Sequence, residues 1–218
     1  MTTARTETDS ARREALAEKL SPHLTPEKWR AVFHGTDPIT FDEAVVTTLY
    51  AETTLMPGWG DPERDGFVAE VERLAARHGG EVDLFVWGAS VVVLQEPHAA
   101  VRMALDLQRG ATASNLRIGV HTGEAVIASF ACNGIACRTL IGAQVGRAAK
   151  VAASAAKGSI VISPDTYVLV HKELHDEAAG CLLTEEFFHD SRMAQALITP
   201  APARGAADLS TFAGLGLT

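Results

Sequence analysis

The sequence predicts an α/β fold of the α+β type, with a ferredoxin-like βαββαβ core and a mixed sheet. Short runs of β-branched and aromatic residues alternate with amphipathic helical patterns, in the order strand–helix–strand–strand–helix–strand. The 218 residues, 47% hydrophobic and 21% charged, suit one globular domain with short extensions. We therefore expect a single sheet with helices packed on one of its faces.

Residues 1–36 are predicted to form a helical extension that precedes the core. The first ten residues are polar, and we expect them to be disordered. From Ala11 onward, apolar residues recur at helical spacing, with a break at Pro22. Thr25 is suited to cap a second helix that has Pro26 at its first position.

The core is predicted to occupy residues 37–198. Its expected elements are a strand at 44–53, a loop at 53–66, a helix at 67–78, two strands within 82–94, a helix at 97–109, two strands within 116–130, a hairpin turn at 133–134, a helix ending near 156, a strand at 159–163, a helix at 164–170 and a last strand at 193–200. The strands within 116–130 are expected to meet at a tight turn at Thr122-Gly123. Residues 199–218, rich in Pro, Ala and Gly, are expected to form a flexible tail.

Composition excludes several classes of partner. A net charge of -8 argues against binding to nucleic acid or to an anionic membrane, both of which require a basic surface. The longest apolar runs are far shorter than a membrane span, and the N-terminus lacks the apolar region of a secretory signal. Three cysteines make a disulfide framework unfavourable, so we expect a cytoplasmic protein.

Cys132 and Cys137 flank the hairpin signal in a C-x4-C spacing. Packing as two small apolar side chains is the favoured interpretation, because paired histidines at zinc-ligand spacing are missing from the sequence. Zinc binding and a redox role remain alternatives, and the sequence leaves the function of the pair open.

Five segments occur in an order and spacing that resemble the catalytic domain of class III adenylate/guanylate cyclases. They are HGGEVDLFVWGASVVVL, ALDLQ, LRIGVHTGEAVIASF, RTLIGAQVGRAAKVA and GSIVISPDTYVLV. The leading LSPHLTPEKWRAVF is similar to the short helix that often precedes that domain, so the resemblance covers residues 18–175. It implies a homodimer, or a heterodimer with another cyclase-like chain, whose sites lie at the subunit boundary. His121, in the HTGE segment, is expected to be a hydrogen-bonded turn residue.

The resemblance also assigns family roles to positions of this chain. In the family, two aspartates hold two metal ions on the triphosphate, a lysine and an aspartate read the purine, and an asparagine and an arginine stabilise the transition state. The metal aspartates correspond to Glu52 and Gly88, and the base-reading pair corresponds to Leu84 and Ala143.

The two transition-state positions are held by Gly146 and Lys150. Each contact of this kind is worth roughly 3 kcal/mol in the transition state, so its loss is severe. Lys150 could still meet a phosphate as a point charge, although a solvated helix face is the more ordinary interpretation. Glu52 is a weak candidate for metal ligation, because its side chain is longer than that of aspartate and Mg²⁺ tolerates poor geometry badly.

Four side chains are expected to make the former nucleotide cleft apolar: Met56, Trp59, Leu84 and Trp87. Packing that closes the cleft is favoured, and binding of a small apolar ligand is the alternative.

The sequence thus predicts a catalytically degenerate cyclase-like domain that acts as a regulatory, dimerising or ligand-sensing module without a cofactor. The alternative is a divergent nucleotidyl cyclase that makes a cyclic nucleotide with altered metal and base recognition. Only this alternative requires Mg²⁺ or Mn²⁺.

Overall fold

The computed structural model describes residues 2–53, 62–86, 88–110, 115–132, 134–179, 181–187 and 194–200. Within them the helices are α1 Thr2–Leu20, α2 Pro26–His34, α3 Pro62–His78, α4 Pro97–Gln108, α5 Gln144–Ser154 and α6 Pro164–Glu177. The strands are β1 Thr40–Thr53, β2 Glu81–Val86, β3 Ala89–Leu94, β4 Leu116–Cys132, β5 Ile135–Ile141, β6 Ser159–Ile162, β7 Cys181–Phe187 and β8 Ala194–Pro200.

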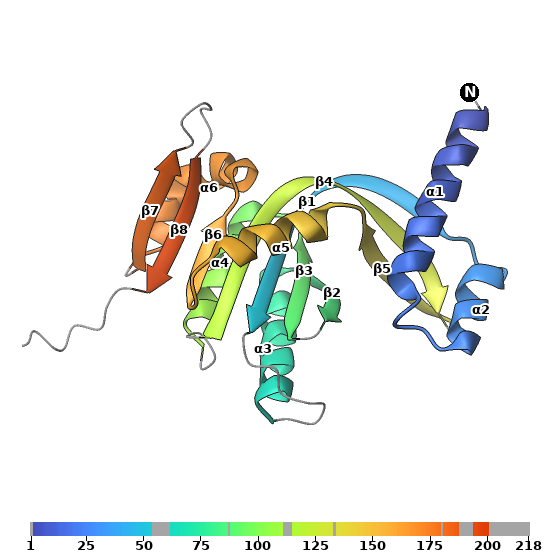
Figure 1. Cartoon of the computed structure of the whole chain (residues 1–218), viewed down its shortest axis with the longest axis horizontal. Helices are drawn as coiled ribbons and strands as arrows, with labels where there is room; N and C mark the ends of the chain where they lie inside the picture. Colours follow the sequence, from blue (N-terminus) through green and yellow to red (C-terminus); the bar gives the residue numbers. More distant parts are fainter. Residues whose placement is uncertain are drawn as a thin grey trace, which may run out of the picture.

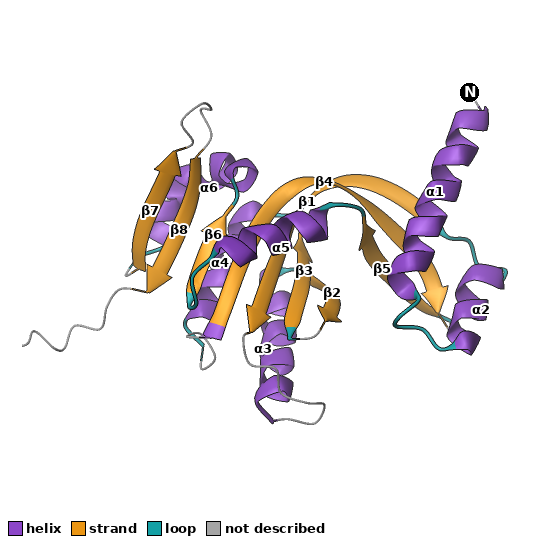
Figure 2. Cartoon of the chain, in the orientation of Figure 1, coloured by secondary structure: helices purple, strands orange, loops and turns teal. Residues whose placement is uncertain are grey.

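All the described strands belong to one mixed sheet (Figure 2). Its order is β2-β3-β1-β4-β6-β8-β7, and β5 pairs with the far half of β4. Only β4 and β6 are parallel among these pairs of described strands. The elements β1, α3, β2, β3, α4 and β4 reproduce the predicted βαββαβ order, which confirms the fold class.

The helices cover both faces of the sheet, which corrects the expectation of one helical face. On one face, α3, α4 and α6 enclose the main core, whose strand side chains include Leu49, Ile118 and Ile160. On the other face lies α5 (Figure 1). Gly119 permits this second layer, because a Cβ there would lie 2.4 Å from the carbonyl oxygen of Ala148.

β4 is one continuous strand, so the predicted tight turn at Thr122-Gly123 is wrong. Thr122 pairs with Thr47 and Gly123 pairs with Val46 in an unbroken antiparallel ladder with β1. A Thr-Gly pair favours a turn locally, but a full-length partner strand satisfies the backbone here and overrides that preference. The predicted hairpin between β4 and β5 is confirmed, with Cys132 opposite Ile135.

α1 begins at Thr2, so the expectation of disorder is also wrong for residues 2–10. The later half of the helix is docked: Leu16 is fully buried against Ala128 and Ile141 in the arm formed by β1, β4 and β5. A helix that is anchored at one end propagates at low cost, since nucleation is the unfavourable step. No helix in the described ranges is long and apolar enough to cross a membrane.

Other predicted boundaries shift in both directions. The Thr25 cap of α2 is confirmed, because its side chain accepts a hydrogen bond from the Lys28 amide. α3 starts five residues before the predicted helix, at Pro62 instead of Phe67, and α6 continues to Glu177. The edge strand β7 was not anticipated. The 199–218 tail overlaps the end of β8, and its residues 201–218 lie outside the described structure.

Candidate functional site

The ends of β1 and of the β2–β3 hairpin form the first wall of the candidate site. Here Glu52 is directly opposite Ala89 in β3 and Arg117 in β4. The Thr53 amide donates a hydrogen bond of 2.8 Å to the Gly88 carbonyl, and Gly88 has a φ of 86°. The two positions that the sequence resemblance assigns to metal aspartates are therefore neighbours in space.

The residues at this wall do not fit a divalent metal ion. Glu52 contributes one half-buried carboxylate, while its cross-strand neighbours are an apolar side chain and a cation. Throughout the described part of the chain, no three His, Cys, Asp or Glu side chains are arranged to hold a metal. Tyr50, two residues earlier, has a pKa raised by burial and then by the Glu52 charge, so its phenol stays protonated.

The second wall is the exposed face of α5. Its N-cap residue, Ala143, makes no side-chain cap, and a Cβ on Gly146 would meet nothing within 4 Å. Lys150 is exposed one turn further along, beside the exposed Arg147. Residues spaced by three and four share a helix face, so these positions form one surface that offers two cations and little else.

Only part of the predicted apolar lining lies within the described residues. Leu84 pairs through its backbone with Val91 in β3, which places it on the strand that borders the first wall. Met56, Trp59 and Trp87 lie outside the described residues, as does the side chain of Leu84. The apolar filling of the cleft therefore stays a prediction.

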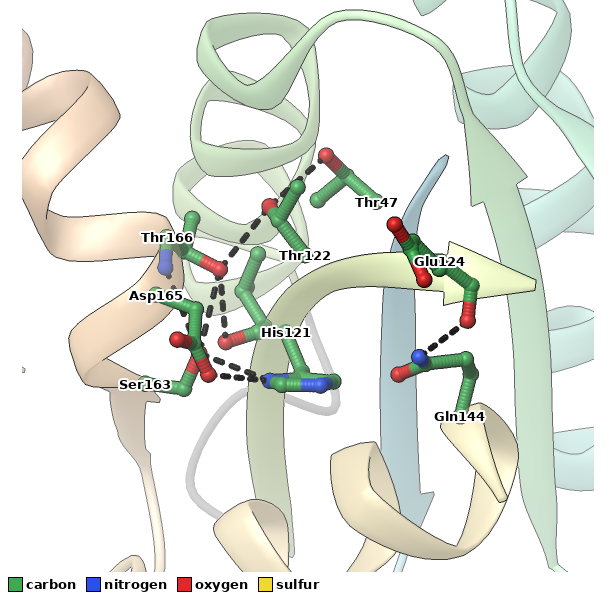
Figure 3. A network of polar contacts seen from close by, with 9 residues as sticks. Thr47, His121, Thr122, Glu124, Gln144, Ser163, Asp165 and Thr166 are labelled. Atoms are coloured by element: carbon green, nitrogen blue, oxygen red, sulfur yellow. Dashed lines mark hydrogen bonds and ion pairs between the residues drawn. The ribbon is translucent and has the colours of Figure 1, made fainter. Parts of the chain in front are cut away.

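A network of polar side chains lies beside the second wall (Figure 3). His121 Nδ1 is 2.9 Å from the hydroxyl of Ser163, which is the N-cap of α6, and 3.7 Å from an Asp165 carboxylate oxygen. Thr166 and Thr122 extend the network with a hydroxyl contact of 3.0 Å. The pKa of His121 is lowered because burial disfavours the charged ring, while Asp165 acts in the opposite direction. As predicted, His121 is hydrogen-bonded, but it lies within a strand and not in a turn.

A buried charge cluster, which was not predicted from the sequence, joins α1 to the sheet. Asp83, at a bulge in β2, accepts hydrogen bonds from Lys19 Nζ at 2.6 Å, the Thr139 hydroxyl at 2.7 Å and the Leu140 amide at 2.8 Å. Its carboxylate is 2% exposed. The available signal was a lone aspartate within an apolar strand pattern, since such a charge requires partners when it is buried.

Cys132 and Cys137 are free thiols near the end of the β4–β5 hairpin. The pKa of Cys137 is raised by burial and by its neighbour Cys132, which makes the thiolate less accessible. Within the described residues no histidine or carboxylate completes a metal site around them.

The sequence matches no family model and no curated protein. Solved structures do match. The guanylate cyclase domain of RhGC from Catenaria anguillulae, in complex with GTP, is 18% identical, covers 74% of this chain and 100% of its own, and has a TM-score of 0.56. The adenylyl cyclase CyaB from P. aeruginosa is 18% identical, covers 76% of this chain and 98% of its own, and has a TM-score of 0.56.

The dimeric guanylyl cyclase domain of the RhoGC fusion protein from Blastocladiella emersonii is also similar in structure to this chain. It is 17% identical, covers 72% of this chain and 97% of its own, and has a TM-score of 0.57. The chain spans almost the full length of each of these domains. The chain therefore has the fold of the class III adenylate and guanylate cyclase catalytic domain.

Proposed function

We propose that this chain is a catalytically degenerate domain of the cyclase fold that serves as a regulatory, dimerising or ligand-sensing module in signalling. The observation that carries the proposal is the first wall of the site. Cyclisation of a nucleoside triphosphate requires deprotonation of an attacking hydroxyl and neutralisation of charge on phosphorus, which is the work of metal ions and fixed cations. Glu52 alone, with Gly88 beside it and Arg117 opposite, is a poor substitute for two aspartates.

The second wall supports the same proposal. Discrimination of a purine requires hydrogen-bonding groups directed at its edge, and Ala143 has none on its side chain. Gly146 has no side chain and open space around it, so this position offers no group that could contact a substrate.

The alternative, a divergent nucleotidyl cyclase, is favoured by two residues. Glu52 keeps one carboxylate at the metal wall, and Lys150 keeps one exposed cation on α5. This alternative requires Mg²⁺ or Mn²⁺ as cofactor.

An assay of cyclisation separates the two functions. We expect the purified chain, incubated with each nucleoside triphosphate and either Mg²⁺ or Mn²⁺, to form no cyclic product above background. Two variants make the assay specific. Glu52→Ala removes the remaining carboxylate, and Glu72→Ala removes an exposed carboxylate of α3 as a matched control. Product that is lost in Glu52→Ala and kept in Glu72→Ala would establish the divergent cyclase instead.

A ligand-sensing role would use the same cleft. The predicted apolar lining favours an apolar or aromatic compound over a nucleotide, because an unpaired polar group buried against it costs about 1–3 kcal/mol. Calorimetric titration tests this: we expect ATP and GTP with Mg²⁺ to bind no tighter than about millimolar. A micromolar dissociation constant for either nucleotide would contradict the degenerate site.

A further inference from the structure

Two buried polar atoms beside the second wall lack hydrogen-bond partners. They are Nε2 of His121, a residue that is 4% exposed, and Oε1 of Gln144, a residue that is 6% exposed. Figure 3 shows the Gln144 carboxamide and the His121 ring facing each other. A buried polar atom without a partner is unfavourable. The ring nitrogen and the carbonyl oxygen face each other, so each is the natural candidate to be the other's partner.

Gln144 is the first residue of α5, and the surrounding structure fixes its carboxamide. The Gln144 amide nitrogen Nε2 donates to the backbone carbonyl of Glu124 in β4. Gly123 leaves room for this contact, because a Cβ there would lie 2.7 Å from that nitrogen. Since Nε2 of the amide is a donor bound to Glu124, the remaining atom Oε1 must face His121 as an acceptor.

The groups next to the two nitrogens of the His121 ring determine which nitrogen carries the proton. An unprotonated Nε2 of His121 would place its lone pair against the lone pairs of Gln144 Oε1, which is repulsive. A protonated Nε2 would instead donate a hydrogen bond to Oε1. Nδ1 is then unprotonated and accepts the Ser163 hydroxyl at 2.9 Å. One tautomer thus satisfies both contacts, and the other tautomer satisfies only the Ser163 contact.

We propose that His121 is a pH-sensitive positioning residue for α5. With its proton on Nε2, it donates to Gln144 Oε1 and holds the first turn of the helix on the sheet. A second proton, on Nδ1, changes the ring from acceptor to donor toward Ser163 and brings it into an ion pair with Asp165. The inference concerns the fold itself and does not depend on whether the domain is catalytic.

The charges around the ring are consistent with this role. Asp165 of α6 lies 3.7 Å from Nδ1 and favours the charged ring, and Arg147 of α5 opposes it. Among the described neighbours, β1 contributes the uncharged Thr48 directly opposite and β6 leads into the uncharged Ser163. When the ring is charged, the Ser163 hydroxyl is free to donate to the Thr166 hydroxyl at 3.2 Å, so every group retains a partner.

The consequence reaches the exposed face of α5. Gln144 lies between Ala143 and Gly146, so the contact between His121 and Gln144 holds the helical turn that carries the second wall. A charged ring keeps its Nε2–H and is the stronger donor, so protonation tightens this attachment. Any partner or ligand that contacts this wall therefore meets a helix end whose attachment responds to pH.

Histidine NMR on the full chain tests the tautomer. Long-range ¹H–¹⁵N spectra, with His121 assigned from a His121→Asn variant, should show the Nε2–H tautomer at about pH 7.5. Asp165→Asn should lower the pKa of His121 and Arg147→Gln should raise it, whereas Glu124→Gln, which alters only an exposed side chain and keeps the carbonyl, should leave it unchanged. A predominant Nδ1–H tautomer would overturn the proposal.

Hydrogen exchange tests the positioning role. Gln144→Leu removes both the acceptor for His121 and the donor to the Glu124 carbonyl, whereas His121→Asn removes the ring alone. In both variants the Arg147 amide, which donates to the Ala143 carbonyl at 2.9 Å, should lose about tenfold in protection, since one such bond changes the local opening equilibrium by that order. Gln144→Glu keeps an acceptor for the ring, should raise the pKa of His121 and provides a second measurement if the leucine variant fails to fold. Unchanged tautomer, pKa and α5 protection in the variants that fold would show that His121 and Gln144 are merely adjacent.

Discussion

At the scale of single residues, burial and hydrogen bonding decide how His121 behaves. Its ring is 4% exposed, and burial lowers its pKa relative to an unfolded chain. The unfolded chain therefore binds a proton at a higher pH than the native protein does, which links folding stability to pH through this one residue.

We expect the free energy of unfolding to fall as the pH drops below about 6.5, where the unfolded histidine begins to take up a proton that the native ring resists. Above that pH, both states hold a neutral ring and the contribution is constant. Urea denaturation of wild type and His121→Asn between about pH 7.5 and about pH 5.5 checks this. The variant should be less stable at neutral pH by about 1–3 kcal/mol and should show a shallower decline. His23→Gln, at an exposed position, is the control, and an equally steep decline in His121→Asn would contradict the assignment.

Two glycines give a paired prediction for the packing of α5. Gly119→Ala would place a Cβ 2.4 Å from both the Ala148 oxygen and the Ala152 nitrogen, so the helix must shift away from the sheet. We expect a loss of about 1–3 kcal/mol in thermal or urea unfolding. Gly146→Ala, in the same helix but with open space around it, should stabilise by about 0.5–1 kcal/mol. Similar effects from both variants would mean that α5 is not packed closely on β4.

At the scale of secondary-structure elements, the attachment of α1 depends on a buried ion pair. Lys19 bridges Asp83 of β2 and the Leu140 carbonyl of β5, so the end of one helix is tied to two strands that are far away in sequence. Removal of one partner of a buried pair is strongly destabilising, because the other charge is left without compensation.

We expect Lys19→Met to lower the free energy of unfolding by about 3 kcal/mol, since the Asp83 side chain, 2% exposed, would lose its cationic partner. Arg138→Gln is the matched control: it breaks an exposed pair with Glu81 in the same region and should change stability by less than about 1 kcal/mol. Urea denaturation measures both. If the two losses were equal, the cluster would contribute no more than a surface ion pair.

At the scale of the whole molecule, we expect assembly. The dimeric guanylyl cyclase domain from Blastocladiella emersonii has the same fold, and a domain from that fusion protein has also been solved as a monomer. We predict that this chain forms a two-fold symmetric homodimer, or pairs with another cyclase-like chain. Light scattering at micromolar concentration should give twice the 23.1 kDa chain mass. A monomeric mass, in the absence of any cyclase-like partner, would contradict the homodimer.

Local patterns determined the central part of the architecture. The β-branched run of β1, the Thr25 cap of α2, the start of α6 at Pro164 and the hairpin between β4 and β5 are properties of short segments, and each appears in the structure close to its predicted place. β7 escaped prediction because it is a sheet edge with weak alternation, and its pairing with β8 is a contact between distant segments. The turn at Thr122-Gly123 failed for the same kind of reason, since β1 supplied a partner that no local window contains.

For the candidate site, the resemblance in sequence predicts which residues take the positions of the cyclase active site, and this assignment stays a prediction: Glu52, Leu84, Gly88, Ala143, Gly146 and Lys150. Only the tertiary structure decided how they meet. The contact between Thr53 and Gly88, the burial of Asp83 by Lys19 and the approach of Gln144 to His121 all join segments that are remote in the chain. Side-chain identity is written in the sequence, but burial, protonation and partners depend on which distant groups exclude water from each other, and that is a property of the folded chain.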